Sequence, residues 1–197
     1  MNATKNLPDY LRKEILLNPE QRVFPDFSVT RLLDTVFKPT QGCRVCILTD
    51  FDEPERWMKD FSFLQSDGFE VQKNAHHYFY ESLRDGVMDE LGMTGGEMFA
   101  YRCTQGSNLD LSDEVWDSEG KELSLNKDIY PHYDIVLCIS TFSATAPLTE
   151  RCKVFGFRGA TMHGMNEIIL RSGLAVDYEE VSDDAEKIRQ ALNRADE

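Results

Sequence analysis

The sequence predicts a three-layer α/β fold with a mostly parallel sheet and helices on both faces. From residue 41 onward, short apolar runs alternate with longer segments whose apolar residues recur at helical spacing. One run, 135–139, is continuously apolar, as in strands that are buried on both faces of a parallel sheet. With 197 residues, 41% of them hydrophobic, the chain can bury a full core, so we expect one α/β domain over 1–197.

Residues 1–40 are predicted to form a helical cover for this core. Segments 8–17 and 28–37 each have apolar residues at helical spacing, and Ser28 is a suitable N-cap for the second. Neither segment is long enough for a separate domain. We therefore expect both to pack on the edge of the sheet.

The apolar run 45–48 is predicted to be the first strand. Pro54 is well placed at the first position of a helix that ends before Gly68. A second strand is expected at 69–71, and a helix with one apolar face at 78–91. The expected inner stripe of the helix that starts at Pro54 is Met58, Phe61 and Leu64.

The middle of the chain is predicted to hold a strand, an irregular insertion and the most strongly specified strand. Residues 98–103 are expected to form a strand, and 105–128 is an acidic segment without clear periodicity. The run 135–139 then leads into a hydroxyl-rich turn at 140–145 and a helix around Glu150.

The last elements are a strand at 157–161, a helix at 166–171 and a final amphipathic helix that ends near residue 197. Asp183 and Glu186 have the spacing of a capping box for the final helix. Its expected inner stripe is Ala185, Ile188, Leu192 and Ala195. This order of elements is typical of Rossmann-like and flavodoxin-like folds.

Composition excludes several classes of function. A net charge of −14 argues against nucleic acid as a partner, because phosphate binding requires clustered Lys and Arg. No apolar stretch approaches the ~20 residues that span a bilayer, and the first residues lack the apolar core of a signal peptide, so we expect a soluble cytoplasmic protein.

Five cysteines, an odd number at wide spacing, suit a reducing compartment. Cys43 and Cys46 have the spacing of a redox or zinc pair, but they enter the first predicted strand, where positions three apart point to opposite faces. We therefore predict that both pack in the core.

Candidate ligand-binding residues follow the predicted strands, because the ligand crevice of an open parallel sheet lies outside the carboxyl ends of its strands. A hydroxyl-rich turn before a helix can bind a small anion, and the alternative is that these hydroxyls only cap the helix. The candidates are Ser140, Thr141, Ser143 and Thr145 after one strand, and Thr161 and His163 after the next.

No metal site is predicted within these residues. Asp50, Asp52 and Glu53 could bind a hard cation, but the same residues are expected at the amino end of the helix that starts at Pro54, where the helix dipole favours acidic side chains. His76 and His77 are adjacent, so they diverge on a strand and cannot share a helix face. The other two histidines, His132 and His163, are isolated.

Common nucleotide and hydrolase motifs are missing. The sequence contains no GxGxxG after its first strand, no P-loop and no GxSxG. These omissions remove the usual grounds for predicting a dinucleotide enzyme, an NTPase or a serine hydrolase.

The last third of the chain resembles a known family. The matching features are the apolar strand before Ser140-Thr141, the run 145–151, GFRGATM at 156–162 with Gly164 after it, and LAVDYEE at 174–180. This segment is similar to the end of the amino-terminal domain of the thermophilic metalloprotease, or aminopeptidase T (leucyl aminopeptidase), family, whose wider relatives include 2,5-dihydroxypyridine 5,6-dioxygenases. His163 departs from the family pattern, which commonly has proline before the glycine.

The resemblance implies an amino-terminal domain of a metal-dependent aminopeptidase, either a fragment of a longer protein or a stand-alone version. In that family the metal ligands lie in a carboxyl-terminal domain, so a divalent metal is expected there and no cofactor in this chain. The implied role is non-catalytic by itself, with that domain or a second copy as partner. The alternatives are a stand-alone module that binds a small anion, and a structural or oligomerisation subunit.

Overall fold

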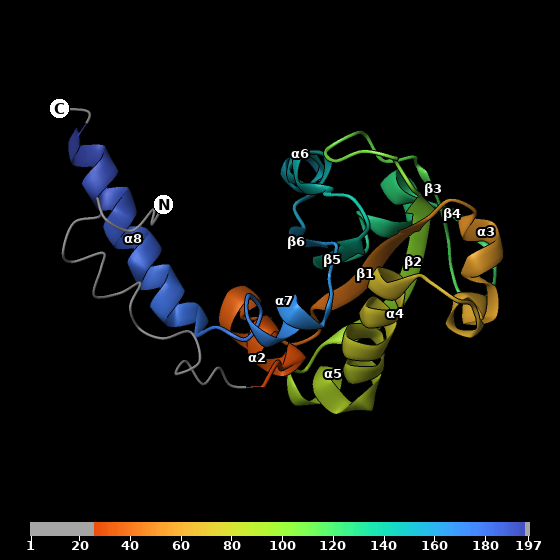
Figure 1. Ribbon diagram of the computed structural model, residues 1–197, viewed down its shortest axis with the longest axis horizontal. Coiled ribbons are helices and arrows are strands. Elements are labelled where there is room, and N and C mark those ends of the chain that lie inside the picture. Colours follow the sequence, from red (N-terminus) through yellow and green to blue (C-terminus); the bar gives the residue numbers. More distant parts are fainter. Residues whose placement is uncertain (1–25, 196–197) are drawn as a thin grey trace, which may run out of the picture.

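The computed structural model of the protein describes residues 26–195 (Figure 1). Within this range the structure has a six-stranded mixed sheet with the strand order β4-β3-β2-β1-β5-β6. The predicted helix at 8–17 lies outside the described residues. The strands are β1 (Arg44–Phe51), β2 (Thr94–Arg102), β3 (Glu114–Trp116), β4 (Glu122–Ser124), β5 (Ile135–Ser140) and β6 (Arg158–His163).

The sheet is mostly parallel, as predicted. β1 lies at its centre and pairs in parallel with β2 on one side and β5 on the other, and β6 pairs in parallel with β5. The hairpin of β3 and β4 adds two short antiparallel strands beyond β2.

Helical segments cover both faces of this sheet, which confirms the predicted three-layer arrangement. α2 (Val29–Leu32) begins at Ser28, whose side chain accepts a hydrogen bond from the Arg31 amide and so acts as the predicted N-cap. The other α-helices are α3 (Pro54–Trp57), α4 (Glu70–Asn74), α5 (Met88–Glu90), α6 (Thr145–Phe155), α7 (Glu167–Arg171) and α8 (Tyr178–Ala195). Five further segments are π-helical or 3-10: Leu33–Phe37, Lys59–Gln65, Ala75–Glu81, Leu83–Val87 and Leu125–Ile129.

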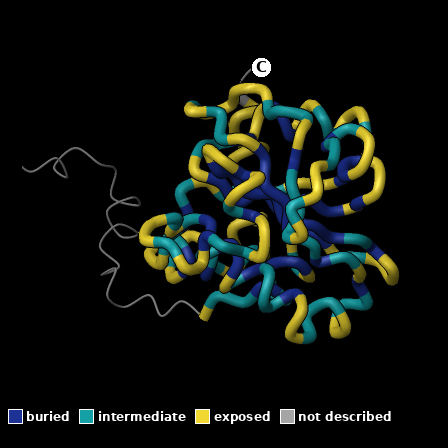
Figure 2. Tube along the Cα trace, turned by 90° about the vertical axis from the view of Figure 1, so that its right-hand side faces the viewer, coloured by how far each residue is buried: buried dark blue, intermediate teal, exposed yellow. Residues whose placement is uncertain are grey.

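Two apolar clusters lie on opposite faces of the central strands, which run through the buried interior of the molecule (Figure 2). Val45 and Ile47 belong to one cluster, while Cys46 and Leu48 belong to the other, as the alternation of side chains along a strand requires. Cys43 packs in the first cluster and Cys46 in the second. This arrangement confirms that the two cysteines point to opposite faces and pack in the core.

The prediction of a strand at 69–71 is wrong, because a helix begins in this segment. Phe69 has left-handed backbone angles (φ 56°), and α4 starts directly after it. Helical structure then continues through the two π-helical segments to the end of α5 at Glu90, with a local break at Gly86 (φ 117°). The helix predicted at 78–91 therefore begins eight residues earlier than expected.

The prediction of irregular structure over 105–128 is wrong in part, because this segment contains β3 and β4. The turn between them is closed by the Asp117 carboxylate, which accepts hydrogen bonds from the amides of Glu119 and Lys121, both at 2.9 Å. Each strand has only three residues, too few for an alternating pattern to stand out in the sequence.

The helix predicted from Pro54 is shorter than expected. Pro54 occupies the first turn of α3 as predicted, but α3 ends at Trp57, and Asp60 and Phe61 then adopt left-handed backbone angles. The Asp60 amide donates to the carbonyl of Ser118 instead of continuing the helix. As a result Leu64, which was predicted to lie on the inner face of this helix, is exposed. Phe63 is buried in its place.

The final helix is present, but its predicted cap and inner stripe are wrong. α8 begins at Tyr178, and the carboxylate of Asp177 accepts hydrogen bonds from the amides of Glu179 and Glu180. Asp183 therefore lies inside the helix. The side chains of Ile188 and Leu192 are 60% and 64% exposed, because α8 projects away from the body of the molecule (Figure 1).

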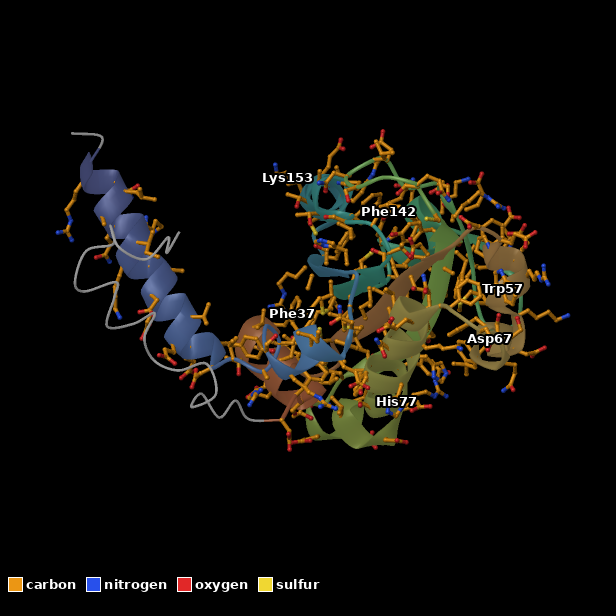
Figure 3. All side chains as sticks on the ribbon, in the orientation of Figure 1. Phe37, Trp57, Asp67, His77, Phe142 and Lys153 are labelled. Atoms are coloured by element: carbon orange, nitrogen blue, oxygen red, sulfur yellow. The ribbon has the colours of Figure 1, made fainter. Side chains whose placement is uncertain are left out.

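The two adjacent histidines lie on one helix but on different faces of it, as their adjacency predicts. Both lie in the π-helical segment Ala75–Glu81, and both approach one carboxylate: Nδ1 of His77 lies 2.8 Å and Nδ1 of His76 lies 3.5 Å from Glu81. The wider π turn places residues five apart on one face, which an α-helical reading of the sequence misses. His76 is buried beside Phe61, whereas His77 points outward (Figure 3).

Candidate functional site

The order of the strands defines where a ligand crevice can form. The chain passes from β1 to β2 on one side, and later returns to β5 on the other side of β1. The carboxyl ends of β1 and β5 therefore form a topological switch point, the place where open α/β sheets bind their ligands. Asp50 lies at the end of β1, and Thr141 follows the last residue of β5.

A crevice of about 420 Å³ opens at this switch point. Its walls come from the end of β1, the start of α4, and the segments that follow β2 and β5. The lining residues carry three carboxylates, two amides and three phenylalanine rings, and no Lys, Arg or His is among them. These polar and aromatic residues are Asp50, Asp52, Glu70, Gln72, Gln105, Phe51, Phe69 and Phe142.

Asp50 is the best-positioned carboxylate of the crevice. Its side chain is only 1% exposed, and its Oδ1 accepts hydrogen bonds from the amide of Thr141 at 2.8 Å and the hydroxyl of Thr141 at 3.0 Å. The side-chain amide of Gln72 donates to the same oxygen at 3.0 Å and to the hydroxyl of Thr141 at 3.1 Å. Donors from two other chain segments thus fix this carboxylate, and all of these bonds are made to Oδ1.

The role expected for Asp50, Asp52 and Glu53 as helix-capping residues is wrong. Asp50 belongs to β1 and bonds across the sheet, and the Asp52 carboxylate accepts a hydrogen bond from the side-chain amide of Gln105. Glu53 occupies the N-cap position of α3, but its side chain makes no capping hydrogen bond. Only the position of Glu53 agrees with the prediction.

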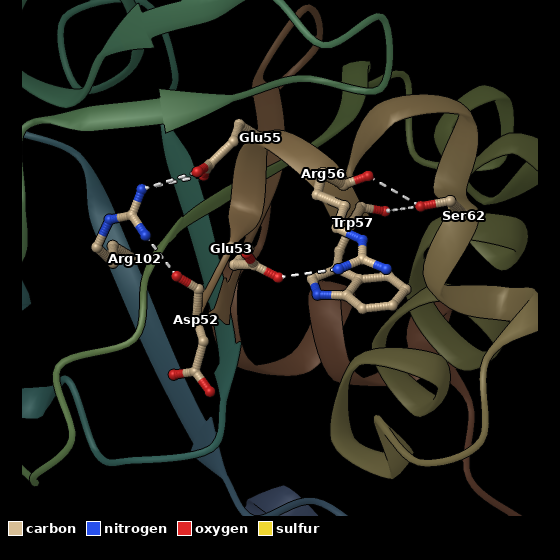
Figure 4. Close-up of polar contacts among 7 residues, drawn as sticks. All are labelled: Asp52, Glu53, Glu55, Arg56, Trp57, Ser62 and Arg102. Carbon is tan, nitrogen blue, oxygen red and sulfur yellow. Dashed lines mark hydrogen bonds and ion pairs between the residues drawn. The ribbon is translucent and has the colours of Figure 1, made fainter.

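An arginine at the rim is already neutralised. Arg102 donates to both carboxylate oxygens of Glu55, at 3.0 and 3.2 Å, and to the backbone carbonyl of Asp52 (Figure 4). Because its charge is paired with Glu55, Arg102 does not offset the carboxylates inside the crevice. The crevice is therefore a region of negative potential within an acidic protein.

The crevice also contains a thiol that is not a ready nucleophile. Burial raises the pKa of Cys103 to about 11, the backbone at Gln105 opposes this rise, and the nearby carboxylates of Asp50 and Asp52 add to it. The thiol is consequently protonated at neutral pH, whereas the thiolate is the reactive form.

The structure separates the six candidate residues into different surroundings. Thr141 lines the crevice, whereas the buried hydroxyl of Ser140 donates to the carbonyl of Phe142 at 2.7 Å. His163 lies exposed at the end of β6 and does not line the crevice.

The remaining candidates form a row of hydroxyls at the amino end of α6. The hydroxyl of Thr145 lies 3.0 Å from that of Ser143 and 2.7 Å from that of Thr161. The side-chain oxygen of Asn108 accepts from the Ala146 amide at 3.0 Å and from the hydroxyl of Ser143 at 3.4 Å. An oxygen acceptor of the protein therefore already occupies one amide that an anion would need.

Four polar residues of the crevice escaped the sequence prediction, and so did its apolar residues. Gln72 was missed because its segment was predicted to begin with a strand, and Gln105 because it lies in the segment predicted as irregular. Glu70 and Cys103 belong to no motif. The one signal available in the sequence was that these residues directly follow a strand or begin a helix. This signal identifies a ligand crevice only when the order of the strands in the sheet is known.

No helix in 26–195 is long and apolar enough to cross a membrane. Within the same residues, no group of three or more His, Cys, Asp or Glu side chains is arranged to hold a metal ion.

Comparison of the chain with family models, with curated proteins and with solved structures gives no match. The resemblance of residues 134–197 to the amino-terminal domain of aminopeptidase T proteins therefore stays a prediction. Its implied partner domain and divalent metal stay predictions with it.

Proposed function

We propose that the protein binds a small organic cation, such as an amine or a quaternary ammonium compound, in the crevice at the ends of β1 and β5. The observation that carries this proposal is the lining of the crevice, which combines the fixed carboxylate of Asp50 with two further carboxylates and no cationic side chain. An ammonium group would complement these charges, and its N–H donors would pair with carboxylate oxygens.

Aromatic rings support the same class of ligand. The rings of Phe69 and Phe142 are half-buried and line the crevice, and a cation over the face of such a ring is attracted by its quadrupole. The side-chain oxygens of Gln72 and Gln105 are further acceptors for the donors of a polar ligand.

The alternative of a small anion at the hydroxyl-rich turn has less support. The hydroxyls of Ser143, Thr145 and Thr161 bond to one another, and Asn108 occupies the amide of Ala146. An anion at Thr141 would also lie beside the carboxylate of Asp50 and be repelled by it.

A thermal-shift screen of the full chain tests the proposal. Choline, agmatine and putrescine serve as cationic probes, and phosphate, acetate and citrate as anionic probes. We expect stabilisation by at least one cation and by no anion, since a ligand at 100 times its Kd stabilises by about 2.7 kcal/mol. Stabilisation by the anions alone would contradict the proposal.

Two variants and one control locate the binding site. Asp50→Asn removes the fixed charge, and we expect it to weaken cation binding by about 10- to 100-fold, because a hydrogen bond to a charged group contributes about 1.5–3 kcal/mol. Glu70→Gln changes an exposed residue of the same crevice without affecting the core, and it should weaken binding in the same direction. Asp34→Asn, an exposed charge outside the crevice, should leave binding unchanged.

A further inference from the structure

α8 is a long helix that contacts other described residues only near its amino-terminal end, beside Leu33–Phe37. It has 18 residues and a length of about 27 Å at 1.5 Å per residue. Its contact with the body is confined to its amino-terminal end, where Glu179, Ser182 and Asp183 lie near Thr35 and Val36. Tyr178 is held there through a hydrogen bond from its hydroxyl to the carbonyl of Leu174 and by the guanidinium of Arg31 over its ring. Every residue from 179 to 194 is exposed.

Such a helix requires a partner for its apolar side chains. Isolated helices of this length are marginal in water, and helices in proteins obtain most of their stability from packing of one apolar face. The face of α8 consists of Val181, Ala185, Ile188 and Leu192, separated by four, three and four residues. This spacing is the heptad pattern of helices that pair in coiled coils.

We propose that the partner is a second copy of this chain, and that two α8 helices pair in an antiparallel coiled coil. Antiparallel pairing places Ile188 opposite Ala185 of the second copy and Leu192 opposite Val181. Each layer then combines a larger with a smaller side chain, which fills the seam evenly. Parallel pairing would instead oppose Ala185 to itself and leave that layer underfilled.

The distribution of charged side chains along α8 also favours the antiparallel orientation. Residues 178–186 of α8 carry five carboxylates, whereas 187–195 carry three basic side chains and no acidic one. In an antiparallel pair the acidic half of each helix faces the basic half of the other, while a parallel pair would set like charges side by side.

The antiparallel arrangement also separates the two acidic bodies. Each chain carries a net charge of −14, so two bodies side by side would repel each other. In the antiparallel pair the two bodies lie at opposite ends of a helix pair about 27 Å long. Because this distance exceeds the Debye length of about 8 Å at physiological salt, the repulsion between the bodies is screened.

Sedimentation equilibrium of the full chain tests the proposal. Across about 1–200 µM, the mass should rise from 22.6 kDa toward twice that value, because association follows mass action. Ile188→Asp combined with Leu192→Asp should remain at 22.6 kDa. Gln190→Asp combined with Asn193→Asp, which adds the same two charges to the same helix outside the apolar face, should associate like the wild type.

The outcome that would overturn the proposal is a wild-type mass of 22.6 kDa at all concentrations, which would mean that residues 1–25 or another protein cover α8. Association of the double-aspartate variant at wild-type strength would overturn it as well. These substitutions lie outside the body, so unfolding of the α/β core by urea should be unchanged in all variants and serves as the folding control.

A disulfide experiment tests the orientation. The antiparallel layers place position 184 beside position 191 of the second copy, so a mixture of Asp184→Cys and Ala191→Cys chains should cross-link on mild oxidation. Each variant alone and the wild type should cross-link more slowly. Equal rates for the mixture and the separate variants would exclude the antiparallel register.

Discussion

Two threonine-to-valine substitutions should change stability in opposite directions. The hydroxyl of Thr141 donates to Oδ1 of Asp50 at 3.0 Å and accepts from the side-chain amide of Gln72 at 3.1 Å. The hydroxyl oxygen of Thr49 is buried and has no hydrogen-bond partner among the described residues. The same chemical change therefore removes a satisfied hydroxyl at one position and an unsatisfied hydroxyl at the other.

The magnitudes follow from these surroundings. A hydrogen bond to a charged group contributes about 1.5–3 kcal/mol, but Thr141 is an exposed residue, so Thr141→Val should lower the free energy of unfolding by about 1 kcal/mol. A buried polar group without a partner costs about 1–3 kcal/mol, so Thr49→Val should raise the free energy of unfolding by about 1 kcal/mol or more. Valine is well tolerated at both sites because its shape matches threonine.

Urea unfolding at pH 7, followed by circular dichroism, measures both changes. We expect the two midpoints to move in opposite directions while the slope m stays constant, since neither variant alters the surface exposed on unfolding. Equal destabilisation by the two substitutions would refute the reasoning, because it would mean that the hydroxyl of Thr49 is satisfied in solution.

Two pH dependences follow from the surroundings of titrating groups. Burial lowers the pKa of His76, so protonation favours the unfolded state and stability should fall as the pH drops from 7 to 5; in His76→Phe this loss, measured by urea unfolding at each pH, should be smaller. An equal loss in the variant would assign it to other groups. Partial burial would raise the pKa of Asp113, but hydrogen bonds from Ser124 and Asn126 outweigh it and the pKa is lowered. The stability from Asp113 is therefore full above its unfolded pKa of about 3.9 and is lost as the pH falls through the lower folded value. The difference in unfolding free energy between wild type and Asp113→Asn should accordingly shrink below about pH 4, and a difference that stays constant with pH would contradict this.

The strands were predictable where apolar patterning alone determines them. The runs at 45–48 and 135–139 became β1 and β5, because continuous apolar sequence has few alternatives to a strand buried on both faces. The segment 69–71, Phe-Glu-Val, is too short and too mixed to separate a strand from the start of a helix, and in the structure α4 begins directly after Phe69.

The crevice was only partly predictable, because its contacts join distant parts of the chain. Asp50 bonds to Gln72, 22 residues away, and to Thr141, 91 residues away. Placing Asp50 and Thr141 after strands identified the correct edge of the sheet. The strand order, which no local pattern specifies, determined that these two residues meet and that His163 stands apart.

The exposure of α8 was not predictable from its amphipathic pattern. A heptad stripe predicts that one face is buried, but it does not distinguish packing on the same body from packing on another chain. The side chains of Ile188 and Leu192 extend into solvent because α8 leaves the body after Tyr178.

The most direct test of the proposed function is a nuclear magnetic resonance titration of the ¹⁵N-labelled chain with choline and, separately, with phosphate. We expect choline to shift the backbone amide of Thr141 and the side-chain amides of Gln72 and Gln105, with a saturable dependence on its concentration. Phosphate should leave these signals in place. Shifts caused by phosphate at Ser143 and Ala146, with no response to choline around Asp50, would contradict a cation-binding crevice.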